Sequence, residues 1–254
     1  MTEPARTPAA PLRAIADALV AGGVRDVVIC PGSRSTPMAL ALKAHPVLRC
    51  WVHLDERAGA FFALGAAKGA RRPAAILATS GTAVVNFAPA VAEARYGRVP
   101  LILLTADRPP ELQGVGAPQT IDQIELYGRH AKWFAELPVP VDDVDADVEL
   151  VSTVARALDV ASAAPAGPVQ LNLPFREPLL PEGPLLLDAD LSESPPEPGP
   201  PPVPPVLIEQ VLPRLHASAR PLIVCGPLDR PGFATVVARL AAELRAPIVA
   251  DVLA

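Results

Sequence analysis

Four short segments place ligand-binding residue types directly after apolar runs. They read CPGSRSTP (30–37), HLDER (53–57), TSGTA (79–83) and TADRPP (105–110). The guanidinium of Arg34 adds positive charge beside the positive end of an expected helix, an arrangement that suits an anionic ligand. A second arginine, Arg108, follows another apolar run, and arginine binds carboxylates through paired hydrogen bonds. The two arginines together predict a site for an anionic substrate.

Two of these segments also have local structural interpretations. Thr36 before Pro37 predicts an N-cap followed by a proline at the first helical position, which accounts for Ser35 and Thr36 without a ligand. The alternative for Arg34 is a solvated surface side chain. The turn at 79–82 offers exposed amides and hydroxyls to a polar ligand, although one glycine is common in any turn between a strand and a helix.

The acidic residues likewise have two interpretations. Asp55 can be the N-cap of a helix and Glu56 a first-turn acid favoured by the helix dipole. The helix that follows, ERAGAFFALGAAKGA, is rich in small residues, which allow close packing against another helix. A carboxylate at its start could then be buried across a dimer. Asp107 and Arg108 could simply pair with each other or cap neighbouring turns.

Alternating strands and helices must position these segments. The apolar patterns predict strands at 25–30, 48–54, 74–79, 100–105 and 168–173, and helices at 10–22, from 37, at 56–69, 82–95 and 146–163, with a less regular region at 109–131. The strands are continuous apolar runs, as in parallel sheets buried on both faces. The fold class is therefore predicted to be α/β with a doubly wound parallel sheet, whose ligands bind at the carboxyl ends of strands.

Proline marks the expected domain organisation. Of 33 prolines in 254 residues, eight fall within 195–205, which favours an extended linker over a helix or a central strand. We predict a first domain over 1–180, a Pro-rich linker over 181–205 and the beginning of a second α/β domain over 206–254. The elements expected in that last region are a helix near 206–217, a strand at 221–225, a helix at 231–245 and a strand at 247–251. Two such units cannot bury both faces of a sheet, so we expect this domain to be incomplete, either as a fragment or until another chain completes it.

Composition and absent motifs exclude several classes. A formal net charge of −5 and a pI near 5.4 give no electrostatic footprint for nucleic acid. Asp17 interrupts the only apolar run near the N-terminus and no uninterrupted stretch of about 18 apolar residues occurs, so we expect a cytoplasmic protein without a membrane span. Cys30 and Cys225 end apolar runs and are interpreted as reduced core residues. The motifs GxGxxG, GxxxxGKS/T, GxSxG and HExxH are all absent, and no His/Cys cluster has zinc spacing.

Together and in this order, the segments resemble the 2-succinyl-5-enolpyruvyl-6-hydroxy-3-cyclohexene-1-carboxylate synthase family of menaquinone biosynthesis. The resemblance is carried by CPGSRSTP (30–37), HLDERAGAFFALGAAK (53–68), TSGTAVVNFAPAVAEA (79–94), PLILLTADRPPEL (100–112) and GAPQTIDQ (116–123). It implies a transferase that depends on thiamine diphosphate and on Mg²⁺ or Mn²⁺. Such an enzyme decarboxylates 2-oxoglutarate and adds the resulting carbanion equivalent to isochorismate.

The resemblance also implies an architecture. The family has a pyrimidine-binding domain, a central domain and a pyrophosphate-binding domain, and this chain would hold the first and the beginning of the second. Metal and diphosphate ligands would then lie outside it, so no metal ligand is assigned here. Active sites in the family form between two subunits, which implies a homodimer or homotetramer. We therefore expect no turnover from residues 1–254 alone.

Site residues follow from the same resemblance. Glu56 matches the cofactor-activating glutamate, whose buried carboxyl favours the imino form of the aminopyrimidine by proton exchange. The positions that match substrate-binding residues are Ser33, Arg34, Arg108 and Gln119. The positions that match cofactor-binding residues, besides Glu56, are Gly32, Ser80, Gly81, Thr82 and Asn86. Pro118 stands where the family more often has Asn, which removes one amide from the edge of the site.

Two alternatives remain open at this point. One is another thiamine diphosphate enzyme, of the acetolactate synthase type, although CPGSRSTP and TADRPPEL supply arginines for a carboxylated acceptor. The other is a non-catalytic dimerising module, because half of a composite site is expected elsewhere.

Overall fold

The computed structural model describes residues 8–141, 143–181, 203–228 and 230–251, which fall into two compact units, Met1–Glu197 and Pro198–Ala254. Most of the predicted linker, residues 182–202, lies outside the described residues, so the domain limits at 180 and 205 stay predictions.

The first unit is built on one parallel sheet of six strands. In sheet order these are β2 (Arg49–Val52), β1 (Asp26–Ile29), β3 (Ala74–Ala78), β4 (Leu101–Asp107), β6 (Pro168–Pro174) and β5 (Phe134–Glu136). All residues of β1, β3, β4 and β6 are buried, as their continuous apolar runs predicted, whereas the edge strand β2 is largely exposed. The predicted α/β fold class with a parallel sheet is confirmed.

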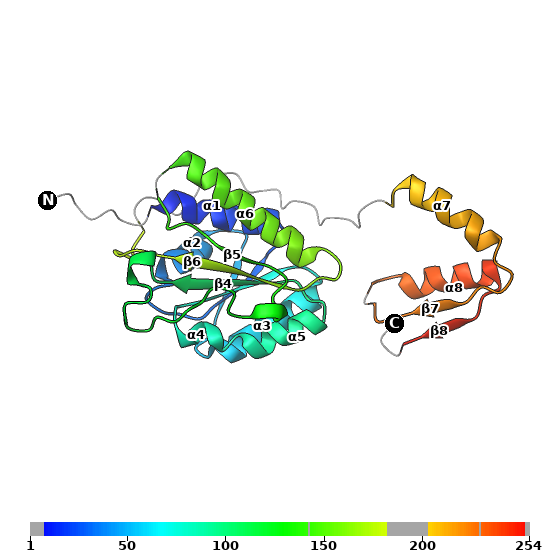
Figure 1. Ribbon diagram of the computed structural model, residues 1–254, viewed down its shortest axis with the longest axis horizontal. Coiled ribbons are helices and arrows are strands. Elements are labelled where there is room, and N and C mark those ends of the chain that lie inside the picture. Colours follow the sequence, from blue (N-terminus) through cyan, green and yellow to red (C-terminus); the bar gives the residue numbers. More distant parts are fainter. Residues whose placement is uncertain (1–7, 142, 182–202, 229, 252–254) are drawn as a thin grey trace. The chain divides into compact units, whose positions relative to one another are not determined.

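Helices cover both faces of this sheet (Figure 1). On one face lie α1 (Ala9–Ala21), α2 (Thr36–Ala44) and α6 (Val144–Ser162); on the other lie α3 (Glu56–Ala70), α4 (Thr82–Val85) and α5 (Ala88–Tyr96). Two short 3-10 helices, Pro110–Leu112 and Gly128–His130, lie in the predicted irregular region. The sheet is thus doubly wound, as expected.

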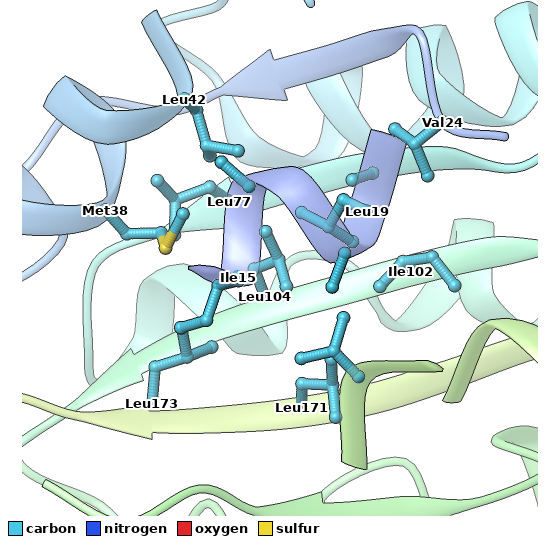
Figure 2. Packing of buried hydrophobic residues seen from close by; sticks show 14 of the residues in the cluster. Ile15, Leu19, Val24, Met38, Leu42, Leu77, Ile102, Leu104, Leu171 and Leu173 are labelled. Atoms are coloured by element: carbon cyan, nitrogen blue, oxygen red, sulfur yellow. The ribbon is translucent and has the colours of Figure 1, made fainter. Parts of the chain in front are cut away.

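Side chains from sheet and helices interlock in two buried clusters, one on each face. Figure 2 shows the first, where Leu19 of α1 packs with Ile102 and Leu104 of β4 and with Leu171 of β6. Burying one leucine of this kind contributes about 1.5–3 kcal/mol relative to leaving it exposed. The core therefore fixes the strands whose carboxyl ends carry the candidate site.

The predicted helix over 82–95 is wrong in one respect, because it is two helices. The chain leaves the helical ladder at Asn86 and Phe87, between α4 and α5. Pro89 explains the break, since it lacks an N–H and its ring clashes with the carbonyl four residues earlier. The buried Tyr127 hydroxyl donates to the Val84 carbonyl across 2.6 Å, which satisfies backbone at the end of α4.

Strand β5 was not predicted. Its three residues pair with β6 at the edge of the sheet, in register Phe134 with Gln170. So short a run contains no full alternation or apolar block, which is why the sequence pattern did not reveal it.

The second unit holds α7 (Pro205–His216), β7 (Ile223–Cys225), α8 (Phe233–Leu244) and β8 (Ile248–Ala250). The two strands are parallel, and Ile223 is in register with Ile248. All four elements were expected close to these positions. Cys30 and Cys225 are both buried, which confirms their interpretation as core residues. In the described part of the chain, no helix has the length and apolar character needed to span a membrane.

Candidate active site

The strand order creates a place at β1 and β3 where neighbouring connections run to opposite sides of the sheet. This switch point lies between β1 and β3, where ligands of open α/β sheets bind at the carboxyl ends of the strands. Gly32, after β1, lies directly against Thr79, after β3: a Cβ on Gly32 would come within 2.4 Å of the Thr79 Cβ. Segments 30–37 and 79–83 therefore meet at the predicted edge, and only glycine allows this approach.

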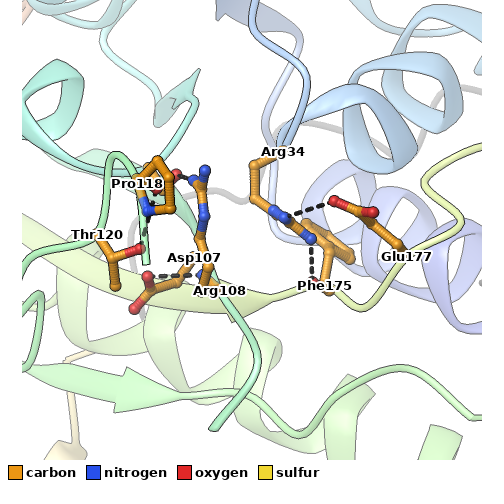
Figure 3. Close-up of polar contacts among 8 residues, drawn as sticks. Arg34, Asp107, Arg108, Pro118, Thr120, Phe175 and Glu177 are labelled. Atoms are coloured by element: carbon orange, nitrogen blue, oxygen red, sulfur yellow. Dashed lines mark hydrogen bonds and ion pairs between the residues drawn. The ribbon is translucent and has the colours of Figure 1, made fainter. Parts of the chain in front are cut away.

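Arg34 is buried at this edge, with a side chain 5% exposed, so its interpretation as a solvated surface residue is wrong. Its Nη1 donates to the Phe175 carbonyl at 2.9 Å and its Nη2 to Glu177 Oε1 at 3.0 Å (Figure 3). The Nε atom is buried and has no hydrogen-bond partner among the described residues. A buried guanidinium with unused donor capacity is suited to binding an anion.

The predicted cap of α2 is wrong by one residue. Ser35, not Thr36, is the N-cap, so Pro37 stands at the second helical position rather than the first. Neither hydroxyl caps the helix. Ser35 Oγ and Thr36 Oγ1 instead donate back to the Gly32 carbonyl, at 3.0 and 3.3 Å. This local bonding holds the Gly32 turn and leaves Ser33 exposed at the edge.

The start of α3 divides two roles between neighbouring acids. Asp55 is the N-cap, as predicted, and accepts from the Ala58 amide at 2.7 Å. Glu56 takes no part in this cap. Its Oε2 accepts from Asn86 Nδ2 at 3.1 Å, across from the end of α4. Glu56 is half-buried, and its charge contributes, after the larger effect of burial, to raising the pKa of the nearby Cys30 thiol to about 12.

The turn after β3 differs from the expectation of exposed amides and hydroxyls. Ser80 and Gly81 are both buried, and the Gly81 amide donates to Gln123 Oε1 at 2.8 Å. Ser80 Oγ is bound by the Arg108 guanidinium. Gly81 has φ +81°, and a Cβ there would lie 2.9 Å from the Gln119 carbonyl oxygen. Among these residues, Thr82 keeps an exposed side chain.

Arg108 and Asp107 do not form the simple side-chain pair considered above. Asp107 Oδ1 accepts from the backbone amide of Arg108 at 2.7 Å, and its Oδ2 accepts from Asn172 Nδ2 at 2.9 Å. Burial raises the pKa of Asp107 and lowers that of Arg108, and the second-largest influence on Arg108 is the positive charge of Arg34. The two predicted arginines therefore lie close enough to repel each other.

Gln119 and Gln123 attach segment 116–123 to these strand ends. Gln119 is exposed, has φ +55°, and its Nε2 donates to the Ser80 carbonyl at 3.0 Å. Gln123 is 1% exposed, and its Nε2 donates to the Ala106 carbonyl and to Asn172 Oδ1, at 3.2 and 2.9 Å. The segment is thus fixed over the ends of β3 and β4.

The structure brings most sequence-predicted site residues to one edge of the sheet. Contacts connect Gly32, Ser80, Gly81, Arg108 and Gln119 around the ends of β1, β3 and β4, with Arg34 beside them. Glu56 and Asn86 form a pair of their own.

Sequence reasoning missed two residues of this edge. Glu177 follows the carboxyl end of β6, so the rule applied to the other four strand ends would have pointed to it. Gln123 lies inside the segment GAPQTIDQ, but no binding or structural role was predicted for it from the sequence. Side-chain groups suited to a metal do not cluster in threes anywhere in the described residues.

Comparison with known proteins identifies the fold's relatives. Residues 12–126 match the family described as thiamine pyrophosphate enzyme, N-terminal TPP binding domain. A 2-succinyl-5-enolpyruvyl-6-hydroxy-3-cyclohexene-1-carboxylate synthase of Geobacillus kaustophilus is 52% identical over 94% of this chain and 42% of its own length. The chain matches the N-terminal portion of this synthase family.

Other synthases of the same name give the same result. That of Chloroflexus aurantiacus is 52% identical over 94% of this chain and 41% of its own length. That of Myxococcus xanthus is 46% identical, over 94% of this chain and 43% of its own length. The chain thus spans about two fifths of the length of these synthases, and the resemblance stated from its motifs is confirmed.

Proposed function

We propose that this chain supplies one half of the active site of a thiamine diphosphate-dependent carboligase that decarboxylates 2-oxoglutarate and adds the product to isochorismate. The main support is the arrangement after the strand ends. Glu56 is free of the capping role, and Arg34 and Arg108 lie close to each other, in segments that follow the order of the synthase motifs. The matched thiamine pyrophosphate domain supports the same cofactor. The synthase relatives support these two substrates.

The residues at the start of α3 fit an aminopyrimidine. Glu56 presents a carboxyl group that Asp55 relieves of helix capping, and Asn86 orients it through one oxygen. Thiamine diphosphate, when bound, supplies a thiazolium carbon that stabilises the negative charge left by decarboxylation. In the proposed role, Glu56 exchanges a proton at its carboxyl oxygen with the pyrimidine ring nitrogen. Gly32, Ser80, Gly81 and Thr82 are proposed to line the cofactor side.

The arginines form the proposed substrate side. Arg34 and Arg108, with Ser33 and Gln119, are assigned to binding the carboxylated acceptor. Both guanidinium groups are held by protein contacts, Arg34 by the Phe175 carbonyl and Arg108 by Ser80. Donors held in place before binding lose less freedom when an anion binds, which favours affinity and orientation.

The proposal also includes a metal ion, Mg²⁺ or Mn²⁺. It further includes assembly into a homodimer or homotetramer and a cytoplasmic location. The metal would bind with the diphosphate, away from the residues assigned here. The outer face of α3 supports an assembly: Phe61 and Phe62 are 39% and 38% exposed, and a Cβ on Gly65 or Gly69 would meet nothing within 4 Å. Close helix packing against a second copy would cover this face.

The test is Glu56→Gln in the full-length polypeptide, meaning the whole reading frame that contains these residues. We expect kcat for carboligation to fall by about 10²-fold or more, because a positioned proton-transfer group contributes that much. Glu93→Gln, an equivalent change at an exposed position on α5, should leave kcat unchanged. Unfolding curves of both variants should match the wild type. Near-normal turnover by Glu56→Gln would refute the assigned role.

A further inference from the structure

Glu177 contributes the acidic partner of Arg34, and no assigned role explains it. It lies 143 positions along the chain from Arg34, just after β6, and its Oε1 accepts from Nη2 at 3.0 Å (Figure 3). The burial of the two side chains is opposite: Arg34 is 5% exposed and Glu177 is 71% exposed. An exposed carboxylate therefore covers one side of a buried guanidinium.

Arg34 does not need Glu177 to stay in place. Nη1 is held by the Phe175 carbonyl, and the backbone of Phe175 is itself fixed by its amide, which donates to the Asp107 carbonyl at 3.0 Å. The Phe175 side chain is fully buried. The Glu177 contact uses a single donor, whereas guanidinium groups can bind a carboxylate through two parallel bonds. The present contact thus uses only part of what Arg34 offers.

The local charges make Glu177 the replaceable acid of this edge. A second nearby carboxylate, Asp107, is 1% exposed and already accepts from Asn172 and from the Arg108 amide. Arg34 and Arg108 repel each other, and Glu177 partly offsets this by its negative charge. A ligand carboxylate would offset it equally, and would also be repelled by Glu177 if both stayed in place.

We propose that the Glu177 carboxylate is an internal stand-in for a substrate carboxylate. It binds Arg34 when no anion is present and is displaced when a carboxylate ligand arrives. The identification of that ligand as a substrate rests on the proposed function; the exchange at Arg34 does not. Glu177 is then a specificity-determining residue, because it sets how strongly an anion must bind to take its place.

The first experiment follows the Arg34 side-chain Nε–H signal by NMR in this chain, with succinate as the carboxylate probe. Glu177→Gln keeps the shape and removes the charge, so it should lower the apparent Kd for succinate by about two- to fivefold, the range expected for an ion pair with an exposed member. The control is Glu111→Gln, which removes the acid of the exposed Glu111–Arg176 pair and should leave the Kd unchanged. Arg34→Gln should remove this signal from the spectrum, which assigns it to Arg34.

Either of two results of this titration would overturn the proposal. One is weaker or equal succinate binding by Glu177→Gln, which would make Glu177 a positioning partner of Arg34 rather than its stand-in ligand. The other is no response of the Arg34 signal in wild type and Glu177→Gln up to the solubility limit of succinate.

The second experiment measures KM for 2-oxoglutarate and for isochorismate in the full-length polypeptide. Glu177→Gln should lower one of these KM values by about two- to fivefold with little change in kcat. No turnover by the wild type would count against the proposed function and leave the succinate titration to decide the role of Glu177. Turnover with both KM values unchanged or raised would reject the stand-in and keep the carboligase.

Discussion

Ion pairs lie at both the amino and the carboxyl ends of the parallel strands, and they differ in which partner is buried. At the amino end, the acid is buried: Asp26, with a side chain 6% exposed, accepts from Arg49, Trp51 and Arg72 at 2.7, 3.0 and 3.1 Å. Arg49 and Arg72 are 61% and 29% exposed. At the carboxyl end, the cation Arg34 is buried and its acid is exposed.

A structural ion cluster and a ligand site can be told apart by how fully the buried charged group is hydrogen-bonded. Arg34 and Arg72 both have a buried Nε without a partner among the described residues, so an orphaned nitrogen alone does not distinguish them. The two clusters differ instead in how many hydrogen-bond partners the buried charged group has. Asp26 is saturated by three side-chain donors, whereas buried Arg34 has one exposed carboxylate and spare donors. A buried charge whose hydrogen bonds are all made within the protein indicates a structural role. A buried charge with unused donors at a strand end indicates a binding role.

The largest expected effect is at the amino end. Asp26→Asn should lower the free energy of unfolding of the first unit by about 3 kcal/mol, because three donors lose a buried charged acceptor and a hydrogen bond to a charged group contributes about 1.5–3 kcal/mol. Urea unfolding at pH 7, followed by tryptophan fluorescence, measures this well, since both tryptophans, Trp51 and Trp133, belong to that unit. Asp159→Asn, at an exposed position on α6, is the control and should have little effect.

The pH dependence of the Asp26 effect has a definite sign. Burial by itself raises the pKa of Asp26, but hydrogen bonds from Arg49, Trp51 and Arg72 outweigh it, so the pKa is lowered in the folded state. A lowered carboxyl pKa stabilises the fold above the ordinary value of about 4 and loses this contribution as pH falls through the folded value. The difference between wild type and Asp26→Asn should therefore shrink below about pH 4. A difference that grows with acid would contradict this account.

Local sequence patterns predicted the positions of helices and strands better than they predicted the side-chain contacts between them. Apolar runs located the central strands, and the strand-end rule located Arg34, Glu56 and Arg108, because these signals depend on neighbouring residues only. The single helix over 82–95 failed because the pattern outweighed Pro89, one residue whose ring breaks the ladder.

Long-range partners had no such local signal. Ser35 and Thr36 have good capping side chains, yet both bond to the Gly32 carbonyl, in a turn that lies directly against Thr79. The contact between Arg34 and Glu177 joins residues 143 positions apart. Spacing cannot reveal a pair of this kind, which depends on strand order.

An intermediate effect is expected at Gln123, in the polar support of the carboxyl end. Gln123→Leu removes the acceptor of the buried Gly81 amide and two donated bonds, at nearly constant volume. We expect a loss of about 2 kcal/mol, since an unpaired buried donor costs about 1–3 kcal/mol. The same urea titration measures it. Gln113→Leu removes two donated bonds at a half-buried side chain but no acceptor of a buried amide, so it should cost less. Equal losses would show that the Gly81 amide is not the determining group.

The smallest effect is expected at Glu177 itself. Glu177→Gln should change the free energy of unfolding by less than about 1 kcal/mol at pH 7, because Glu177 is 71% exposed and solvent screens its charge. The change should fade in about 1 M NaCl, where the screening length is about 3 Å. The urea midpoint with and without salt measures both. A loss of unfolding free energy as large as that of Asp26→Asn would contradict this. Glu177 would then be a structural partner of Arg34, just as Arg49 and Arg72 are structural partners of Asp26. A replaceable carboxylate predicts two results together for Glu177→Gln: a small, salt-sensitive loss of stability and tighter binding of succinate. A structural partner of Arg34 predicts the opposite, because its removal would destabilise the fold and would not improve ligand binding.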